Sequence, residues 1–383
     1  MRACWSHFVL RGCLLAVLSV LACPAWPQDV SEDSDSSRRE GSDVMPDIRD
    51  AKSRLKYRMR NFVVVPIPLS NPTLDTGLIL AGAYFWPQTP EQKEVQPASV
   101  TGAAGMYTSN DSYFYGIAHN HYWGDDRWRF EGVLGHVDLK LKLRLPGNLP
   151  SDPYVDWVLD GDFLNLKLLR RIRGDWYGGF VARYLSLEQT FGIEFPAADA
   201  ALAYKADTIG LGLALEYDTR DSQFSSHSGR HFELDSLINR QSLGSDEDYE
   251  WYQGAFSSYH ELFPKWVLAW ELKGCKVSGE APLWDSCRVD LRGFPATEYL
   301  GSASLSGQAE ARWQFHRKWG AVAFAGTGTV KDSFGREPGS ETVPSYGLGL
   351  RFMVLEEHRI NVRLDYARSK DNDGVYLAVG EEF

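Results

Sequence analysis

Few side chains in this sequence have the types and spacing that catalysis or metal binding requires. His119 and His121 lie two residues apart, so on a strand they would share a face, but no cysteine or further histidine lies nearby to complete a metal site. His231 or His260 could serve a lipid hydrolase together with a serine, and the sequence gives no reason to choose one. The chain contains no Gly-x-Ser-x-Gly motif, phosphate-binding glycine loop or Cys-x-x-Cys pair. We therefore expect no enzymatic activity, no metal and no cofactor.

Composition narrows the class of protein. With 51 acidic and 40 basic residues the formal net charge is -11, which argues against a nucleic-acid partner bound through its phosphates. After residue 22 no stretch approaches the run of about 18 apolar residues that a membrane helix needs. A transmembrane β-barrel has the same average polarity as a soluble protein because half of each strand faces a polar interior. Composition leaves both of these classes open.

The N-terminus predicts export from the cytoplasm. Arg2 and Arg11 precede a short apolar core over 12–22, which is typical of a secretory signal peptide and is too short to span a membrane. We expect a signal peptide over 1–25, with lipoprotein processing at Cys23 as the alternative. Residues 26–60 contain few apolar side chains and are expected to form a disordered periplasmic linker.

The compartment indicates the redox state of the remaining cysteines. Cleavage of the signal would remove the first three cysteines and leave Cys275 and Cys287 in an oxidising environment, where a single pair readily closes. A disulfide between these two residues is therefore expected. The alternative, two free thiols, is not excluded by their spacing.

From residue 61 to the end, apolar and polar residues alternate with a period of two. The pattern is clearest over 303–315, where Trp313 and Phe315 stand at one end of the apolar face, as a membrane interface favours. It returns over 208–218 and 359–366, with charged residues on the second face. Charges on the inner face predict a water-filled interior.

Sixteen such segments predict an all-β fold, a transmembrane antiparallel β-barrel over 61–383 with a long inward-folding loop between strands 11 and 12. Connectors expected outside the cell are long and periplasmic ones short, apart from 88–99. Pro66 and Pro68 also weaken the first strand, since proline belongs at sheet edges. The expected strands are 61–69, 76–87, 100–109, 112–123, 127–143, 154–170, 174–190, 206–219, 229–240, 249–262, 265–277, 303–315, 319–330, 345–355, 358–368 and 374–383. The long outer connectors are 144–153, 191–205, 278–302 and 331–344.

The longest connector contains Leu291-Arg292-Gly293-Phe294. This motif is similar to the Arg-Gly-aromatic loop tip of the BamA/TamA superfamily of outer-membrane assembly and translocation barrels, which the sequence resembles. The segments 63–78, 212–235 and 375–383 resemble its bacterial surface antigen branch, without the periplasmic POTRA domains. The terminal Phe383 resembles the sorting signal that outer-membrane barrels present to the assembly machinery during their biogenesis. The resemblance covers about residues 61–383.

This resemblance implies a loop latch made of Arg292, Gly293, Phe294 and Glu310. A guanidinium inside a barrel is costly unless a carboxylate accepts its planar fork, and Glu310 faces inward on the next strand. Family members often carry a second wall carboxylate in a Phe-x-Asp-x-Gly setting, where this chain has Gly326. Because this chain lacks that carboxylate, Glu310 is expected to be the main partner of Arg292.

The resemblance also implies a non-enzymatic protein at the bacterial outer membrane that assists insertion or transport of protein or lipid. The alternatives are a passive pore and a barrel-embedded lipid hydrolase. Expected partners are outer-membrane lipid, the assembly machinery during biogenesis and an unidentified periplasmic protein that would supply docking, with no nucleic acid.

Overall fold

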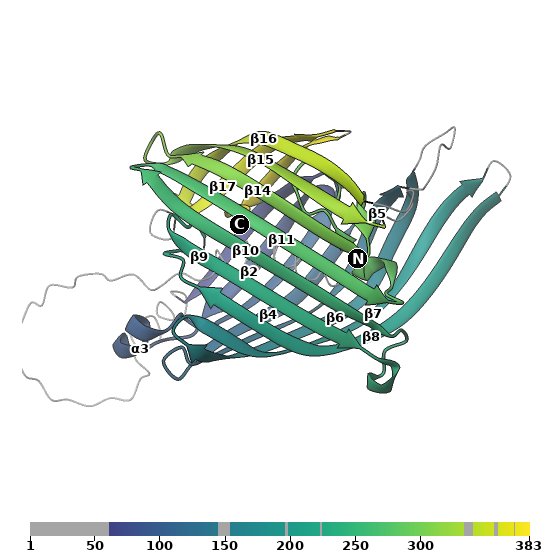
Figure 1. Ribbon diagram of the computed structural model, residues 1–383, viewed down its shortest axis with the longest axis horizontal. Coiled ribbons are helices and arrows are strands. Elements are labelled where there is room, and N and C mark those ends of the chain that lie inside the picture. Colours follow the sequence, from purple (N-terminus) through teal and green to yellow (C-terminus); the bar gives the residue numbers. More distant parts are fainter. Residues whose placement is uncertain are drawn as a thin grey trace, which may run out of the picture.

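The computed structural model describes residues 61–144, 154–195, 198–222, 224–332, 340–355, 359–370 and 372–383. Within these residues sixteen antiparallel strands close into a barrel (Figure 1). The expected all-β, 16-stranded barrel is therefore confirmed. The expected signal peptide at 1–25 and linker at 26–60 lie outside the described residues and stay predictions.

Each strand pairs with its neighbours in sequence, except at two places. β11 pairs with β14 because the short β12 and β13 form a separate two-stranded sheet within the intervening loop, and β1 meets β18 to close the barrel. The barrel strands are β1 (Phe62–Asn71), β2 (Asp75–Phe85), β3 (Val100–Thr108), β4 (Tyr113–Trp123), β5 (Trp128–Arg144), β6 (Tyr154–Arg173), β7 (Trp176–Phe195), β8 (Ala198–Asp218), β9 (Gly229–Asn239), β10 (Tyr249–Phe263), β11 (Trp266–Gly279), β14 (Ala303–Trp313), β15 (Trp319–Lys331), β16 (Ser340–Leu355), β17 (Ile360–Ser369) and β18 (Asp373–Val379). The remaining elements are β12 (Cys287–Arg288), β13 (Leu300–Gly301), α3 (Pro90–Val95), η1 (Gln241–Leu243) and η2 (Leu283–Asp285).

All sixteen expected strands are present, and the main error concerns two connectors. The segment 191–205 was expected to be a long loop, but β7 continues to Phe195 and β8 begins at Ala198. Likewise β16 begins at Ser340, inside the expected loop 331–344. β7 and β8 thus form a long hairpin that projects beyond the rim (Figure 1). Period-two patterning fades where neither face of a strand contacts lipid, so the sequence hides these extensions.

The connector between β2 and β3 contains the short helix α3. Thr89 begins it with a capping box, in which Thr89 Oγ1 accepts from the Gln92 N–H at 3.3 Å and Gln92 Oε1 accepts from the Thr89 N–H at 3.0 Å. Pro90 suits the first turn because its missing N–H would have no partner there. No helix among the described residues is long and apolar enough to cross a membrane. We call the end of the barrel that carries α3 the proximal end, and the opposite end the distal end.

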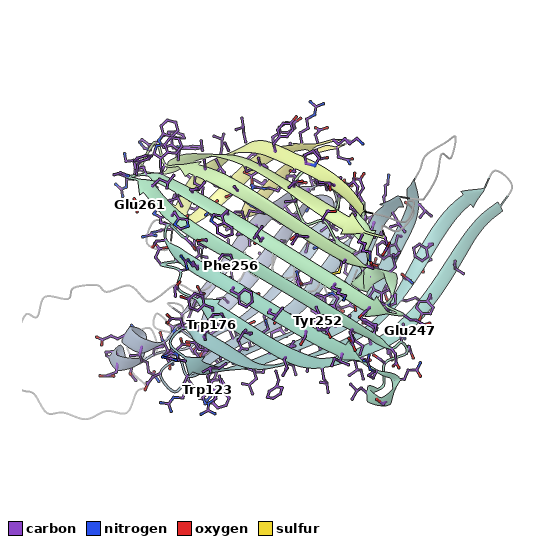
Figure 2. The ribbon with its side chains drawn as sticks, in the orientation of Figure 1. Trp123, Trp176, Glu247, Tyr252, Phe256 and Glu261 are labelled. Carbon is purple, nitrogen blue, oxygen red and sulfur yellow. A yellow bond between two sulfur atoms is a disulfide. The ribbon has the colours of Figure 1, made fainter. Side chains whose placement is uncertain are left out.

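The outer face carries a girdle of aromatic side chains near each end of an apolar belt. Figure 2 shows Trp123 and Trp176 toward the proximal end and Tyr252 farther along the wall. Two such girdles are typical of membrane barrels, whose aromatic side chains lie at the lipid headgroups. The exposed proximal tryptophans are Trp86, Trp123, Trp176, Trp266, Trp313 and Trp319, and the exposed distal tyrosines are Tyr107, Tyr115, Tyr184, Tyr252, Tyr346 and Tyr366.

The interior differs between the two halves of the chain. The inner faces of β2 to β7 are largely apolar and form one buried cluster that includes Phe114, Leu139 and Trp157. The inner faces of β14 to β17 instead carry buried charged residues such as Glu310 and Asp365. The N-terminal half therefore has a packed hydrophobic core, although it also buries charged residues such as Lys167 and Arg183, and the expected polar interior is most pronounced in the C-terminal half.

Candidate functional site

The loop between β11 and β14, residues 280–302, is fixed at its base. Cys275 on β11 and Cys287 on β12 form a disulfide with a Cα–Cα distance of 5.5 Å. β12 and β13 pair next to it, with Cys287 opposite Gly301 and Arg288 opposite Leu300. The two cysteines expected to pair are thus brought together, and the bond ties the loop to the barrel wall.

Arg292 projects from this loop onto the inner faces of three strands. It is 2% exposed, and its Nη2 donates to Glu310 on β14, as the sequence suggested. Its Nη1 also donates to Asp365 Oδ2 on β17 at 2.7 Å, and its guanidinium lies 3.4 Å from the centre of the Phe324 ring on β15. The planar fork is therefore shared by two carboxylates and stacked on an aromatic face.

Asp365 is the residue that sequence reasoning missed. Glu310 was expected to be the main partner because Gly326 stands where family members often carry a second wall carboxylate, but a second carboxylate comes from β17. Gly326 has a packing role instead: a Cβ there would lie 2.8 Å from the Gly307 carbonyl oxygen and 3.0 Å from Leu291 Cδ2. The available signal was the inward-facing Asp365 in the alternating pattern of 359–366.

Gly293 and Phe294 hold the tip of the loop in its buried position. The Gly293 N–H donates to the Tyr376 hydroxyl at 2.7 Å, and its carbonyl accepts from Ser369 Oγ at 2.9 Å. Its φ of 99° is a left-handed conformation that favours glycine. The buried Phe294 packs edge-on against Tyr299 with ring centres 5.3 Å apart. All four expected latch residues therefore lie in one buried site, whose function as a latch stays a proposal.

A second buried ion pair holds the start of the loop on the opposite wall. Asp285 accepts from Arg183 Nη2 on β7 at 2.5 Å and from the Tyr249 hydroxyl on β10, and the side chains of Arg183 and Asp285 are fully buried. Farther along, Thr297 Oγ1 donates to the Lys142 carbonyl at 2.6 Å. The loop thus enters the lumen from the distal end and contacts both halves of the wall.

The junction of β1 and β18 is weakly paired. It contains one registered pair, Ser70 with Leu377, whereas β1 and β2 share ten pairs and β17 and β18 share seven. β18 ends at Val379, so Phe383 does not end the strand as expected. Phe383 instead lies in the lumen, where its main-chain oxygen accepts from Arg312 Nη2 at 3.0 Å. Its expected role as a sorting signal stays a prediction.

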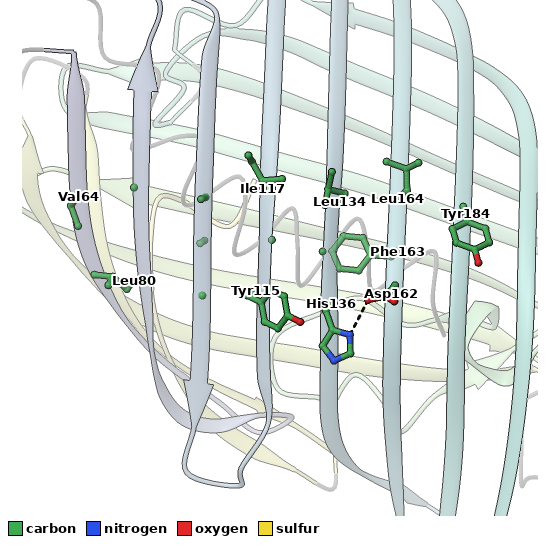
Figure 3. Close-up of a pocket in the computed structure, with 16 residues that line it drawn as sticks. Val64, Leu80, Tyr115, Ile117, Leu134, His136, Asp162, Phe163, Leu164 and Tyr184 are labelled. Atoms are coloured by element: carbon green, nitrogen blue, oxygen red, sulfur yellow. Dashed lines mark hydrogen bonds and ion pairs between the residues drawn. The ribbon is translucent and has the colours of Figure 1, made fainter. Parts of the chain in front are cut away.

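An apolar hollow of about 780 Å³ runs along the outer wall from β1 to β7 (Figure 3). Val64 on β1 and Leu80 on β2 line one side, and Leu164 on β6 and Tyr184 on β7 line the other. At the edge of the hollow His136 Nδ1 lies 2.9 Å from Asp162 Oδ1. The outer wall from β1 to β7 therefore offers an apolar surface to lipid.

The histidines singled out from the sequence assemble no site. His119 and His121 stack with ring centres 5.5 Å apart, and His119 Nδ1 bonds Thr101 Oγ1. His260 Nε2 lies 2.9 Å from Ser258 Oγ, and the described residues give His260 no acidic partner to complete a triad. The one candidate metal-ligand group among the described residues consists of Glu216, Asp218 and His231. Arginines already bind both of its carboxylates, with Arg129 on Glu216 and Arg220 on Asp218.

Comparisons with known proteins agree with this architecture. The Omp85 superfamily domain matches residues 175–383. The chain is similar to the structure of BamA from Haemophilus ducreyi lacking POTRA domains 1-3, with 13% identity and a TM-score of 0.58 over 83% of this chain and 69% of that one. It is also similar to CdiB from Acinetobacter baumannii (12% identity, TM-score 0.56, 83% of this chain and 59% of that one). CdiB from Escherichia coli is matched at 10% identity and a TM-score of 0.57, over 83% of this chain and 62% of that one.

The chain spans less than two thirds of either CdiB structure. No curated protein sequence matches it. At these identities the structural likeness concerns the fold alone.

Proposed function

Because the chain belongs to the Omp85 superfamily, we propose that it works at the outer membrane of a bacterial cell, where it assists the insertion or transport of protein or lipid. The proposed role is not enzymatic. It requires a place where a client can contact both the barrel and the bilayer.

The observation that carries this proposal is the junction of β1 and β18. A sheet edge with unpaired N–H and C=O groups can accept an added strand, and a single registered pair at this junction leaves most of both edges unpaired. The apolar hollow begins at β1 and extends along the wall to β7, so lipid would contact the outer face next to the junction. Opening here would break few hydrogen bonds and would expose the lumen sideways to the membrane.

The interior supports a gated role over a passive pore. The core of the N-terminal half fills one side of the lumen, and the loop 280–302 crosses the lumen through its contacts at Asp285 and Arg292. A passive pore would need an open polar path. A hydrolase would need a catalytic triad, and Ser258 and His260 are a pair without an acid among the described residues.

The partners follow from the same role. Outer-membrane lipid would contact the belt between the two aromatic girdles, and the assembly machinery would receive the chain during its own biogenesis. An unidentified periplasmic partner would approach the proximal end, where α3 lies, and we propose that 1–25 directs export and that 26–60 links the barrel to that side.

The test is to close the junction. Cysteines replacing Ser70 and Leu377 would be joined by a short thiol cross-linker in barrels reconstituted into liposomes, and the folding of an added outer-membrane protein would be followed by gel shift. We expect the cross-link to abolish assisted folding and cleavage of the linker to restore it.

The control is a cross-link that shares one of the two positions. Ser70 also pairs with Thr76 on β2, so joining cysteines at 70 and 76 adds the same chemistry to a ladder that is already closed. Assistance that survives the 70–377 cross-link would contradict the proposal. A steady conductance in planar bilayers, unaffected by that cross-link, would favour the passive pore instead.

A further inference from the structure

Residues 380–383 turn away from β18 into the lumen and bind a cluster of arginines on the inner wall. Arg351 Nε donates to Glu381 Oε2 at 2.6 Å, Arg363 pairs with Glu382, and Arg312 Nη2 donates to the Phe383 oxygen at 3.0 Å. Arg312 also lies 5.2 Å from the centre of the Phe383 ring. We call Arg312, Arg351 and Arg363 the arginine cluster.

Two prolines explain why this segment leaves the wall. From the pair of Ser70 with Leu377, counting along both strands sets Pro68 opposite Val379 and Pro66 opposite Glu381. The ladder of β1 with β2 is regular at both prolines, so their nitrogens, which carry no hydrogen, face the junction. The edge of β1 therefore offers no N–H donor to a continued β18 at these two positions.

Gly380 supplies the turn. Its φ of 93° is a left-handed conformation, and its N–H donates to the Asn361 carbonyl at 2.7 Å. Because β18 is joined to β1 by one registered pair, the segment can swing about Gly380 without breaking a ladder with β1.

The charges of the inner wall require an anion at this place. Arg292 and the arginine cluster place four positive charges around two wall carboxylates, Glu310 and Asp365. Glu381 and Glu382 bring the two negative charges that balance this surplus. Buried cations need such partners because desolvation is otherwise uncompensated.

The arginine cluster has hydrogen-bond donors that residues 380–383 do not use. Arg312 Nη1 and Arg363 Nε are buried without a hydrogen-bond partner among the described residues. Next to the segment lies a cavity of about 50 Å³, to whose lining the segment contributes one carboxylate, that of Glu381. The cationic side chains that line this cavity are Lys265, Arg312, Lys318 and Arg351.

We propose that the arginine cluster is a binding site for peptide segments in which two successive acidic residues precede an aromatic one, and that residues 380–383 are its exchangeable resident ligand. A peptide is favoured over a small anion because the site binds two successive carboxylates and an aromatic ring, the ring lying 6.3 Å from that of Tyr259. This binding property goes beyond the proposed function, and it would hold even if the junction of β1 and β18 never opened.

The test weakens the resident ligand and leaves the cluster intact. A fluorescent peptide of residues 379–383, Val-Gly-Glu-Glu-Phe, would be titrated against the full chain in detergent. The variant E381Q/E382Q should bind it about tenfold more tightly than the unmodified protein, because the resident no longer competes through its charges. Adding R312Q and R351Q should abolish the gain, and a Val-Gly-Gln-Gln-Phe peptide should not bind.

The matched control is E247Q/E250Q, which changes two glutamates near the distal rim and should leave peptide affinity unchanged. Folding of every variant is checked by heat-dependent gel mobility. If E381Q/E382Q does not fold, F383A replaces it, since that change weakens the resident and keeps all the charges. Equal affinity of the weakened and unmodified proteins for the peptide would overturn the proposal, as would equal competition by millimolar inorganic phosphate.

Discussion

Replacing Arg292 by alanine tests whether one guanidinium holds the loop to two strands. The side chains of Glu310 and Asp365 are fully buried, and each keeps a positive partner when Arg292 is removed. Arg312 Nε remains 2.8 Å from Glu310, and Asp365 keeps Arg351 and, at 3.7 Å, Arg363. Both carboxylates then share less positive charge in a buried site. Removing one partner of such a group typically costs about 3–5 kcal/mol, which is the expected loss of stability for R292A.

The E310Q variant should cost less. Arg292 keeps its bond to Asp365 at 2.7 Å, so no charge on the loop is stranded, and the loss is that of charge-assisted hydrogen bonds, about 1.5–3 kcal/mol. The double variant R292A/E310Q lacks the carboxylate of Glu310, which R292A alone leaves buried with one arginine fewer. Its stability should therefore fall no further than that of R292A alone.

Thermal unfolding followed by gel mobility, with limited proteolysis of 280–302, measures both effects. R368A serves as the control because Arg368 is exposed on the same strand as Asp365. Losses that are equal in the two single variants and additive in the double variant would refute the shared site, and Arg292 would then act independently of Glu310.

Three further outcomes are expected. Cys275 and Cys287 should resist alkylation until reduced, and replacing both by serine should lower stability by about 3 kcal/mol by freeing the loop base in the unfolded chain. G326L should displace the loop and raise protease cleavage of 280–302, because even its Cβ would lie 2.9 Å from Gln308 Cβ. D285N should leave Arg183 uncompensated in a fully buried site and lower the unfolding temperature, whereas R183Q/D285N should recover part of the loss.

The strands were predictable because the membrane imposes a simple rule on them. Lipid outside and polar or tightly packed groups inside force the alternation seen over 303–315, where Leu305 and Trp313 are exposed and Glu310 is buried. The same rule identified Glu310 as inward-facing and so as the candidate partner of Arg292. The rule ends where the lipid ends, so the extensions of β7 and β8 were read as loop.

The missed parts of the site depend on contacts between distant strands. Asp365 lies 73 residues from Arg292, and only barrel closure brings β17 beside the loop. The turn of 380–383 into the lumen likewise depends on Pro66 and Pro68 on a strand at the other end of the chain. Local patterns carry no information about such pairs, although they did show that the individual residues were unusual.

The two prolines also bear on how copies of the barrel behave when crowded in one bilayer. A wall with an unpaired edge could join the same edge of a neighbouring copy and form a fused double barrel. Pro66 and Pro68 interrupt the donors along that edge, so two β1 strands could share only a broken ladder. Two copies meeting edge to edge would lack donors on both strands at these positions, so self-association through β1 is weakened more than pairing with a strand that carries its own donors.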